Sequence, residues 1–433
     1  MEYRKIYICG HKNPDVDSLT SAYALAELRK KTLDKSIHIE ALCAGQLPSK
    51  AEWVFNHFGV VPPRSKMDVF VRVADIISPN LVPIAATMPL IEALKKLEAS
   101  GQSSLPVVTG EGMFAGMLSP IKLLNFFIEG RSLQTPVGEV PLGESLVLAA
   151  HDKVHDVQGS VLKSTHNHFP VLDESGHFVG TLLKKAFAET PPFRMILVDH
   201  NETAQGIPGL EEIPVIEVVD HHRISFSPTM EPIRYTADTV GSTCTIVAKL
   251  YRAAGMRPSK QVAGIMLAGI VADTLLFQSP TTTDTDRLVA TWLEKLCGET
   301  AQALMDGMMS IPSPMMSMAP RAAVESDMKI YSEAGYKFSL SQIEEPNLTL
   351  FHHRIRSFVD AMDMLRREHG LDFAGLLVTD PGRAHSELLY VGKESIKRAL
   401  PWRKSLTGVF SLPGILSRKK QLLPQVMATI SGM

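Results

Sequence analysis

The sequence predicts an α/β fold: a parallel-sheet domain interrupted by an inserted α+β module and followed by a C-terminal α/β domain. Three observations predict it. Short apolar strands alternate with amphipathic helices near the N-terminus, an internal repeat occupies the next stretch, and the α/β alternation then returns. The chain has 433 residues, which is enough for several domains with separate cores.

Four segments follow from this pattern. Residues 1–67 form the first part of the parallel-sheet domain, 68–190 the inserted module, 191–312 the second part, and 319–433 the C-terminal domain. An insertion of this kind is tolerated where the ends of an exposed loop lie close together. The prolines at 312 and 314 mark a linker before the last segment.

The first segment predicts a strand, a helix and a second strand. Lys5–Cys9 is a short apolar strand, 18–31 has helical periodicity with Ser18 as its cap, and 37–42 is apolar again. This spacing is typical of a parallel α/β unit.

The second segment contains two copies of one pattern, in which a helix is followed by two strands and another helix. Leu105-Pro-Val-Val corresponds to Phe169-Pro-Val-Leu, and Phe114-Ala-Gly-Met corresponds to Phe178-Val-Gly-Thr. Two copies predict a paired module with a cleft on a pseudo-twofold axis.

The third segment returns to α/β. Residues 194–198 and 214–219 are apolar strands, 242–254 is a helix, and the apolar stretch 262–272 precedes a helix from Thr283. The fourth segment is a separate α/β domain that closes with a basic cluster.

Charge and composition exclude several classes of protein. Lys+Arg is 44 and Asp+Glu is 46, which removes the strongly basic signature of a nucleic-acid binder. The 4 cysteines have no knuckle spacing and are too few for a disulfide scaffold. The longest apolar stretch, 263–272, is about half of the ~20 residues that a bilayer span needs. We therefore expect a cytoplasmic protein without a signal peptide, a membrane partner or a nucleic-acid partner.

Carboxylate and imidazole side chains follow the apolar elements, at the edge where ligands collect in parallel α/β sheets. The set is His11, Asp15, Asp17, Asp199, Asp220, His221, His222 and Asp273. Four or more carboxylates in one crevice repel one another, and two divalent cations would remove that repulsion. Carboxylate with imidazole suits Mn, Fe, Co, Ni or Zn, and two-metal sites recur in phosphoryl hydrolysis.

A basic cluster, Ser417-Arg-Lys-Lys-Gln421, lies near the C-terminus. Taken alone, it is compatible with a solvated run of charge or with a clamp for phosphate oxygens.

The motifs His11-Lys-Asn-Pro-Asp15-Val-Asp17, Asp199-His200-Asn201, Asp220-His221-His222 and Asp273-Thr274 together resemble the DHH phosphoesterase superfamily. With the basic cluster, the chain resembles the family II inorganic pyrophosphatases. The insertion resembles the tandem CBS pair of the CBS-domain-containing subclass. The resemblance implies a DHH domain, an inserted CBS pair and a C-terminal DHHA2 domain.

The resemblance also implies residue roles. The metal ligands are His11 and Asp15 for one ion, Asp17 and His221 for the other, Asp199 for both, and Asp273 to complete the site. The catalytic residues are His222, Asp17 and Asp199, and the substrate-binding residues are Lys329, Arg418, Lys419 and His222. Asp220 is expected to orient His221.

The implied reaction is hydrolysis of inorganic pyrophosphate to two phosphates by a metal-bridged hydroxide. The implied cofactors are two Mn²⁺ or Co²⁺ ions per active site, with Mg²⁺ accompanying the substrate. A homodimer is expected from the paired CBS modules.

Regulation by adenine nucleotides is a separate question. The first copy has Lys122 where nucleotide-binding CBS motifs carry Asp, and the second has Ala186 there and Leu183 in place of the hydroxyl residue. Nucleotide binding and a vestigial or dimer-forming pair therefore both remain open.

Other functions also remain open. Another DHH enzyme, an exopolyphosphatase or a nucleotide phosphodiesterase, would use the same metal ligands. A non-catalytic nucleotide sensor is the alternative from a different class, although a sensor would not need the complete set of acids and histidines.

Overall fold

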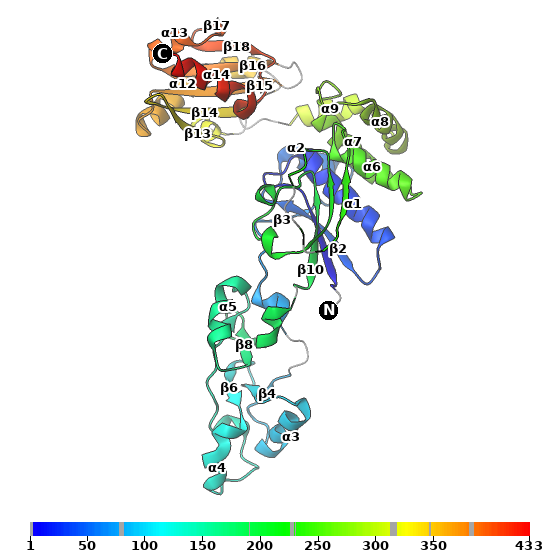
Figure 1. Cartoon of the computed structure of the whole chain (residues 1–433), viewed down its shortest axis with the longest axis vertical. Coiled ribbons are helices and arrows are strands. Elements are labelled where there is room, and N and C mark those ends of the chain that lie inside the picture. Colours follow the sequence, from blue (N-terminus) through cyan, green and yellow to red (C-terminus); the bar gives the residue numbers. More distant parts are fainter. Residues whose placement is uncertain are drawn as a thin grey trace. The chain divides into compact units, whose positions relative to one another are not determined.

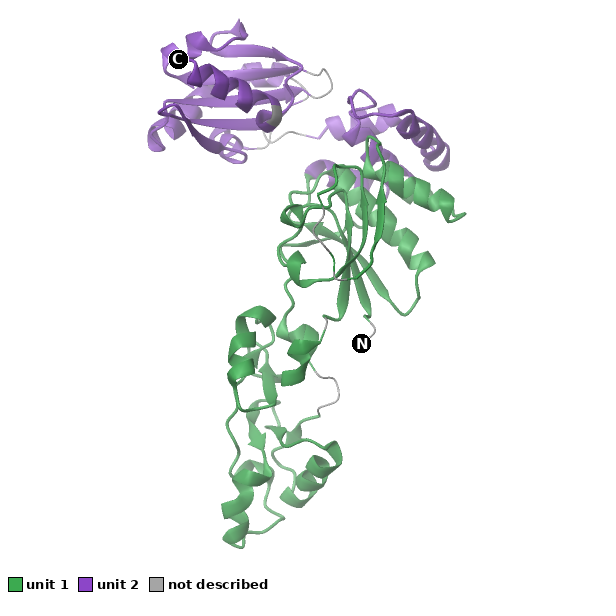
Figure 2. Cartoon of the chain, in the orientation of Figure 1, with its two compact units in different colours: residues 1–48, 61–262 green, residues 49–60, 263–433 purple. Residues whose placement is uncertain are grey.

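The computed structural model describes residues 3–77, 82–189, 191–225, 229, 231–311, 318–345, 348–380 and 385–433. The chain divides into two compact units, residues 1–48 with 61–262 and residues 49–60 with 263–433, which Figure 2 colours separately. The predicted linker prolines at 312 and 314 lie outside the described residues.

The first unit contains a six-stranded sheet in the order β12-β11-β10-β1-β2-β3. Strands β2, β3 and β10 of this sheet are labelled in Figure 1. Its strands are β1 (Lys5–Cys9), β2 (His38–Ala44), β3 (Arg64–Lys66), β10 (Phe193–Val198), β11 (Val215–Asp220) and β12 (Arg234–Ala237). All neighbouring strands are parallel, which confirms the predicted sheet. The strand order reverses between β1 and β10, and ligands bind beyond the carboxyl ends of strands at such a point.

Helix α1 (Val16–Thr32) follows β1, and its first turn differs from the prediction. The N-cap is Asp15, whose side-chain oxygen accepts a hydrogen bond from the Ser18 amide at 2.9 Å. The predicted cap Ser18 is therefore wrong, because Asp15 already supplies the oxygen that the first turn needs. Gly10 allows the preceding loop to approach the helix, since a Cβ there would lie 1.9 Å from Ser18 Oγ.

A buried ion pair joins α1 to β11. Arg29 Nε donates to Glu217 Oε2 at 2.9 Å, and Arg29 Nη2 donates to the other oxygen of the same carboxylate. Both side chains are almost fully buried, so the two-pronged contact compensates the cost of removing two charges from water. The pair fixes the helix that follows the first loop against the strand that precedes His221.

The inserted module consists of two copies of one small fold, which confirms the predicted repeat. The first copy contains β4 (Ile84–Ala85), α3 (Leu90–Ser100), β5 (Leu105–Val108) and β6 (Phe114–Leu118). The second contains β7 (Leu148–Ala149), α5 (Val154–Lys163), β8 (His168–Leu172) and β9 (Phe178–Leu183). In both copies the first two strands pair parallel and the last two antiparallel.

Each copy ends in a short helical segment. In the first, the 3-10 turn η2 (Pro120–Leu123) leads into α4 (Leu124–Ile128), and in the second the 3-10 turn η4 (Lys184–Ala188) stands alone. The chain continues from the module into β10, and the 3-10 turns η5 (Thr203–Gln205) and η6 (Leu210–Glu212) lie between β10 and β11. The η1 turn (Val73–Ile76) lies at the other connection, before β4.

Helix α6 (Thr243–Ala253) follows β12 and packs against α1. The two helices are tied together where the Tyr251 hydroxyl donates to the Ala24 carbonyl at 3.0 Å. Its N-cap is Ser242, at the predicted beginning of the helix.

Helix α7 (Lys260–Asp273) replaces the predicted apolar strand-like stretch, so Asp273 is the last residue of a helix and does not follow a strand. A continuous apolar run is ambiguous between a buried strand and a buried helix, and the length of this run favours the helix. The second unit also contains α2 (Ser49–His57), α8 (Asp284–Cys297) and α9 (Ala301–Met309).

The C-terminal sheet of the second unit has the order β13-β14-β15-β16-β18-β17 and is mixed. Its strands are β13 (Lys329–Glu333), β14 (Tyr336–Glu344), β15 (Phe373–Asp380), β16 (His385–Gly392), β17 (Arg403–Leu406) and β18 (Val409–Pro413). Helices α11 (Pro320–Glu325) and α12 (Leu348–Glu368) contribute to the core on one face, and α13 (Glu394–Ala399) and α14 (Leu423–Ser431) to the core on the other.

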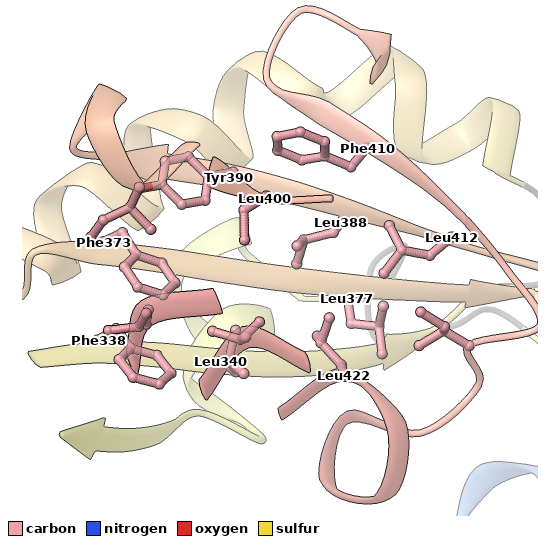
Figure 3. Close-up of a cluster of buried hydrophobic side chains, with 14 residues drawn as sticks. Phe338, Leu340, Phe373, Leu377, Leu388, Tyr390, Leu400, Phe410, Leu412 and Leu422 are labelled. Carbon is pink, nitrogen blue, oxygen red and sulfur yellow. The ribbon is translucent and has the colours of Figure 1, made fainter. Parts of the chain in front are cut away.

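Alternate residues of β15 divide between these two cores, as the pleat of a strand requires. Phe373 and Leu377 join the core of α13 and α14, drawn in Figure 3, and Leu376 and Val378 join the other. Phe373 also stacks on Phe338 with ring centroids 4.7 Å apart. The basic cluster lies next to this core, in the single π-helical turn η8 (Arg418–Leu422).

Among the residues that the structure describes, every helix is too short or too polar to cross a bilayer.

Candidate metal centre

The loop after β1 carries the first group of predicted ligands. His11 Nδ1 donates to the Lys12 carbonyl at 3.1 Å, so Nε2 is the ring atom that faces the carboxylates. That Nε2 atom lies 3.4 Å from Asp15 Oδ2 and 3.3 Å from Asp199 Oδ2. Asp15 uses its other oxygen to cap α1, so one carboxylate both starts the helix and faces the imidazole.

Asp199 lies at the end of β10 and connects the two groups of ligands. Its backbone has a φ of 59°, a left-handed conformation that is uncommon for a residue with a side chain. Its amide donates to the Val219 carbonyl at 3.0 Å, which anchors this turn on β11. One carboxylate oxygen faces His11, and the other lies 3.4 Å from His221 Nε2. The two oxygens of Asp199 therefore face histidines from two different loops.

His221 and His222 follow β11, and each ring has its own carbonyl or carboxylate partner. His221 Nδ1 donates to the Val240 carbonyl at 2.9 Å, so its Nε2 is the ring atom that faces Asp199. His222 Nδ1 donates to Asp220 Oδ1 at 2.9 Å. The prediction that Asp220 orients His221 is therefore wrong: Asp220 orients His222.

Asp17 lies in the first turn of α1, and its buried carboxylate accepts three hydrogen bonds from the beginning of α6. The donors are Ser242 Oγ at 2.6 Å, the Thr243 amide at 2.7 Å and the Cys244 amide at 3.1 Å. A helix N-terminus presents amides to an anion in this way. The sequence predicted Asp17 as a ligand but did not predict these three hydrogen-bond donors. Ser242, at the beginning of the predicted helix, was the one indication of them.

Burial and charge shift the pKa values of this cluster. Burial raises the pKa of Asp17 to about 6, and the negative charge of Asp199 adds to the effect. Burial works against ionisation of Asp199 as well, but hydrogen bonds from His11 and His221 hold its pKa below the usual range. The imidazole of His11 loses hydration by burial, yet Asp15 and Asp199 raise its pKa to about 11.

These side chains fit divalent cations. The ligand atoms of His11, Asp15 and Asp199 all lie within 4.8 Å of one another, as do those of Asp199, His221 and His222. The two groups share Asp199 and combine carboxylate oxygen with imidazole nitrogen, which is the donor set of Mn²⁺ and Co²⁺ sites. The raised pKa of Asp17 reflects in part its repulsion from the buried carboxylate of Asp199. Bound cations would relieve that repulsion.

The other predicted site residues lie in the second unit. Asp273 is the last residue of α7, Lys329 begins β13, and Arg418 with Lys419 begins the π-helical turn η8. Arg418 Nη1 donates to Asp327 Oδ2 at 2.7 Å, and the Arg418 amide donates to Gln342 Oε1 at 2.8 Å. The roles of these four residues, like those of the predicted ligands in the first unit, stay predictions.

Two family profiles match the chain. One is described as "DHH family, N-terminal domain" and matches residues 5–270, and the other is described as "DHHA2 domain" and matches residues 306–429. The first spans both parts of the parallel-sheet domain together with the insertion, and the second spans the C-terminal sheet.

Curated relatives cover most of the chain. A cobalt-dependent inorganic pyrophosphatase of Clostridium perfringens is 25% identical over 543 aligned positions, covering 98% of each chain. That alignment is longer than the 433 residues here, so the relative has additional residues within the matched region. A manganese-dependent inorganic pyrophosphatase of Methanothrix thermoacetophila is 34% identical over 235 residues, covering 53% of this chain and 75% of the relative.

A solved structure supports the fold alone. A Methanococcus jannaschii protein, provisionally described as a family II inorganic pyrophosphatase, matches 99% of this chain and 100% of its own with a TM-score of 0.53. The two sequences are 21% identical.

Proposed function

The chain belongs to the DHH family, within its metal-dependent inorganic pyrophosphatases, and on this premise we propose that it hydrolyses inorganic pyrophosphate to two phosphates. The observation that carries the proposal is Asp199, whose two oxygens face His11 and His221 at 3.3 and 3.4 Å. A carboxylate placed between two imidazoles in this way suits a ligand shared by two cations.

We assign the metal ligands as follows. His11 and Asp15 would hold one ion, Asp17, His221 and Asp273 the other, and Asp199 both. Bound Mn²⁺ or Co²⁺ would supply Lewis acidity and a nucleophilic water at neutral pH, with Mg²⁺ accompanying the substrate. In both histidines Nδ1 donates to a backbone carbonyl, so Nε2 is the atom available for a metal.

His222 contacts the substrate in this proposal. Its side chain is 51% exposed, and Asp220 holds Nδ1, so Nε2 is the atom left to contact a phosphate oxygen or to supply a proton to the leaving phosphate. Asn201 donates to the second oxygen of Asp220 at 2.6 Å, which keeps that carboxylate in place.

Arg418, Lys419 and Lys329 would bind the phosphate oxygens. A guanidinium group presents a planar fork to two oxygens, and an ammonium group adds a point charge. Gln342 supports this role, because it accepts from the Arg418 amide and donates to the Leu416 carbonyl at 2.9 Å, which fixes the basic turn on β14.

A phosphate-release assay tests the function, together with chromatography of the products for the dinucleotide, whose phosphodiester hydrolysis releases no free phosphate. The metal-loaded chain is offered pyrophosphate, tripolyphosphate and a cyclic dinucleotide, each with Mn²⁺ or Co²⁺. We expect rapid release from pyrophosphate. Rapid release from tripolyphosphate alone would indicate an exopolyphosphatase, hydrolysis of the dinucleotide alone a phosphodiesterase, and no hydrolysis of any substrate a sensor. Each of these three results would overturn the proposal.

Regulation by adenine nucleotides at the inserted module is the finer part of the proposal. Residues 203–213, which we call the bridging segment, contact both the module and the metal loop. His155 Nδ1, in the second copy, donates to Glu212 Oε1 at 2.5 Å, and the Lys12 amide donates to the Gln205 carbonyl at 2.7 Å. A ligand that moved His155 would therefore act on the segment that holds the neighbour of His11.

We also propose a homodimer and a cytoplasmic location. Apolar side chains at the end of the first copy are exposed, among them Ile121, Leu124 and Ile128, and a second copy of the module is the partner we assign to them. The four cysteines are free and buried, which suits a reducing compartment.

A further inference from the structure

Thr243, the first residue of α6, contacts both of the buried carboxylates in the metal centre. Its backbone amide donates to Asp17 Oδ2 at 2.7 Å, and its side-chain Oγ1 donates to Asp199 Oδ1 at 2.9 Å. The residue is fully buried. One threonine therefore connects a predicted ligand of one cation with the predicted shared ligand.

The position of Thr243 is fixed by its neighbours. Ser242 caps α6 by accepting from the Cys244 amide at 3.0 Å, and Ser242 Oγ also donates to Asp17. Further along the helix, Tyr251 is hydrogen-bonded to α1. Because Asp17 lies in the first turn of α1, the contact between the two helices sets where the Thr243 hydroxyl lies.

Asp199 needs such a partner more than an ordinary carboxylate does. It occupies a left-handed turn, and its oxygens must face His11 and His221 at the same time. Rotation about the side-chain torsion would turn the plane of the carboxylate away from one histidine. The Thr243 hydroxyl donates to the oxygen on the His221 side and opposes that rotation.

We propose that Thr243 is a positioning residue that holds Asp17 and Asp199 in the arrangement that two cations require. The inference rests on the proposed metal centre and deepens it. Hydrogen-bond partners of metal ligands commonly change metal affinity by about 10- to 100-fold when they are removed. The side chain of Thr243 acts on Asp199 alone, since its contact with Asp17 is made by the backbone.

The variant Thr243→Val separates these contacts. Valine keeps the shape of the side chain and the backbone amide and removes only the hydroxyl. Thr243→Ser keeps the hydroxyl and removes the methyl group. The matched control is Thr181→Val, at a fully buried threonine of β9 whose Oγ1 has no hydrogen-bond partner among the described residues.

The measurement is Co²⁺ affinity of the full chain, by equilibrium dialysis against a competing chelator, together with the visible absorption of bound Co²⁺. We expect Thr243→Val to bind Co²⁺ at least about tenfold more weakly, with an altered spectrum and an unchanged thermal midpoint of the metal-free chain. Thr243→Ser and Thr181→Val should bind like the unmodified chain.

Equal Co²⁺ affinity in Thr243→Val and the unmodified chain would overturn the inference, and so would an equal loss in Thr243→Val and Thr243→Ser. If the valine variant does not fold, Thr243→Ala can be compared with Thr243→Ser. Alanine removes the hydroxyl group and serine keeps it, so the comparison tests the same contact. Failure of the proposed function would be distinguishable from failure of this inference. An unmodified chain that binds Co²⁺ but does not hydrolyse pyrophosphate would contradict the proposed function, and the Co²⁺ affinities of the variants could still be compared.

Discussion

Asp199 combines a left-handed backbone with a carboxylate placed between two histidines. Holding a residue with a side chain in this region costs about 1–3 kcal/mol, and such strain persists where the surrounding contacts over-determine it. The contacts here are the amide bond to Val219 and the hydroxyl bond from Thr243. The strained backbone of Asp199 therefore indicates that the direction of its carboxylate, toward His11 and His221, serves the metal centre and not the stability of the fold.

At the same scale, Asp220 controls His222. Asp220→Asn should lower kcat for pyrophosphate about 10- to 100-fold, because the amide no longer fixes the ring through Nδ1. Co²⁺ affinity should stay within about twofold, since His221 keeps its own carbonyl partner. Steady-state kinetics and dialysis measure the two effects. Asp238→Asn is the matched control, at an exposed acid paired with Lys249, and equal kinetics in both variants would contradict the assignment.

The sequence predicted the acids and histidines but not all of their partners. Asp220 and His222 are two residues apart, and alternate side chains of an extended chain share a face, so their contact could have been predicted from the end of β11. Thr243 could not, because its contact with Asp199 depends on how α6 packs against α1. A cap residue in the sequence shows where a helix begins but not which anion it faces.

At the scale of elements, the loops after β1, β10 and β11 and the first turn of α1 carry the predicted ligands of the first unit. Alternation of strand and helix predicted these three strands, and the parallel order places their carboxyl ends at one edge. The apolar stretch before Asp273 was ambiguous, and α7 shows why: a helix that is apolar on all sides has no periodicity to identify it.

The Arg29–Glu217 pair tests how α1 is held on β11. Arg29→Met should destabilise the chain by about 3–5 kcal/mol, because it removes the two-pronged partner of buried Glu217 and leaves the more distant Arg234, at 3.8 Å. The double variant Arg29→Met/Glu217→Leu should recover most of that stability. Urea unfolding followed by circular dichroism gives both values. A single variant that unfolds at the same urea concentration as the unmodified chain would show that the pair contributes little.

The bridging segment makes a second prediction at this scale. Adenine nucleotides should change the turnover of the unmodified chain, and Glu212→Gln should reduce that response at least about threefold by weakening the charged contact with His155. Nucleotide affinity and basal turnover should stay near normal. Glu211→Gln is the matched control at the neighbouring exposed acid. A full response in Glu212→Gln would exclude this contact from the coupling, and no response in the unmodified chain would favour a vestigial module.

At the scale of the whole molecule, the sequence predicted the repeat and the two α/β regions. Both copies of the module have the predicted strands, because each strand is short, apolar and bounded by turn residues. The boundaries of the four segments stay predictions. The sequence could not predict that most of α7 belongs to the second compact unit. The division into units depends on contacts between residues that are distant along the chain.

Arg418 and the metal centre belong to different units of the chain, and the proposed reaction needs both. The sequence identified the basic cluster but not the residues that hold it. Asp327 contacts Arg418 from the turn before β13 and Gln342 contacts it from β14, and neither contact has a local signal in the sequence.

The number of cations held by the full chain tests the central claim most directly. Dialysis against Co²⁺ followed by metal analysis should find two ions per unmodified chain, and far fewer in Asp199→Asn, since asparagine tolerates the left-handed turn but removes the shared charge. The same variant should lose more than about 99% of its pyrophosphate hydrolysis while keeping its thermal midpoint in the metal-free state. Two bound ions and near-normal hydrolysis in Asp199→Asn would contradict the account.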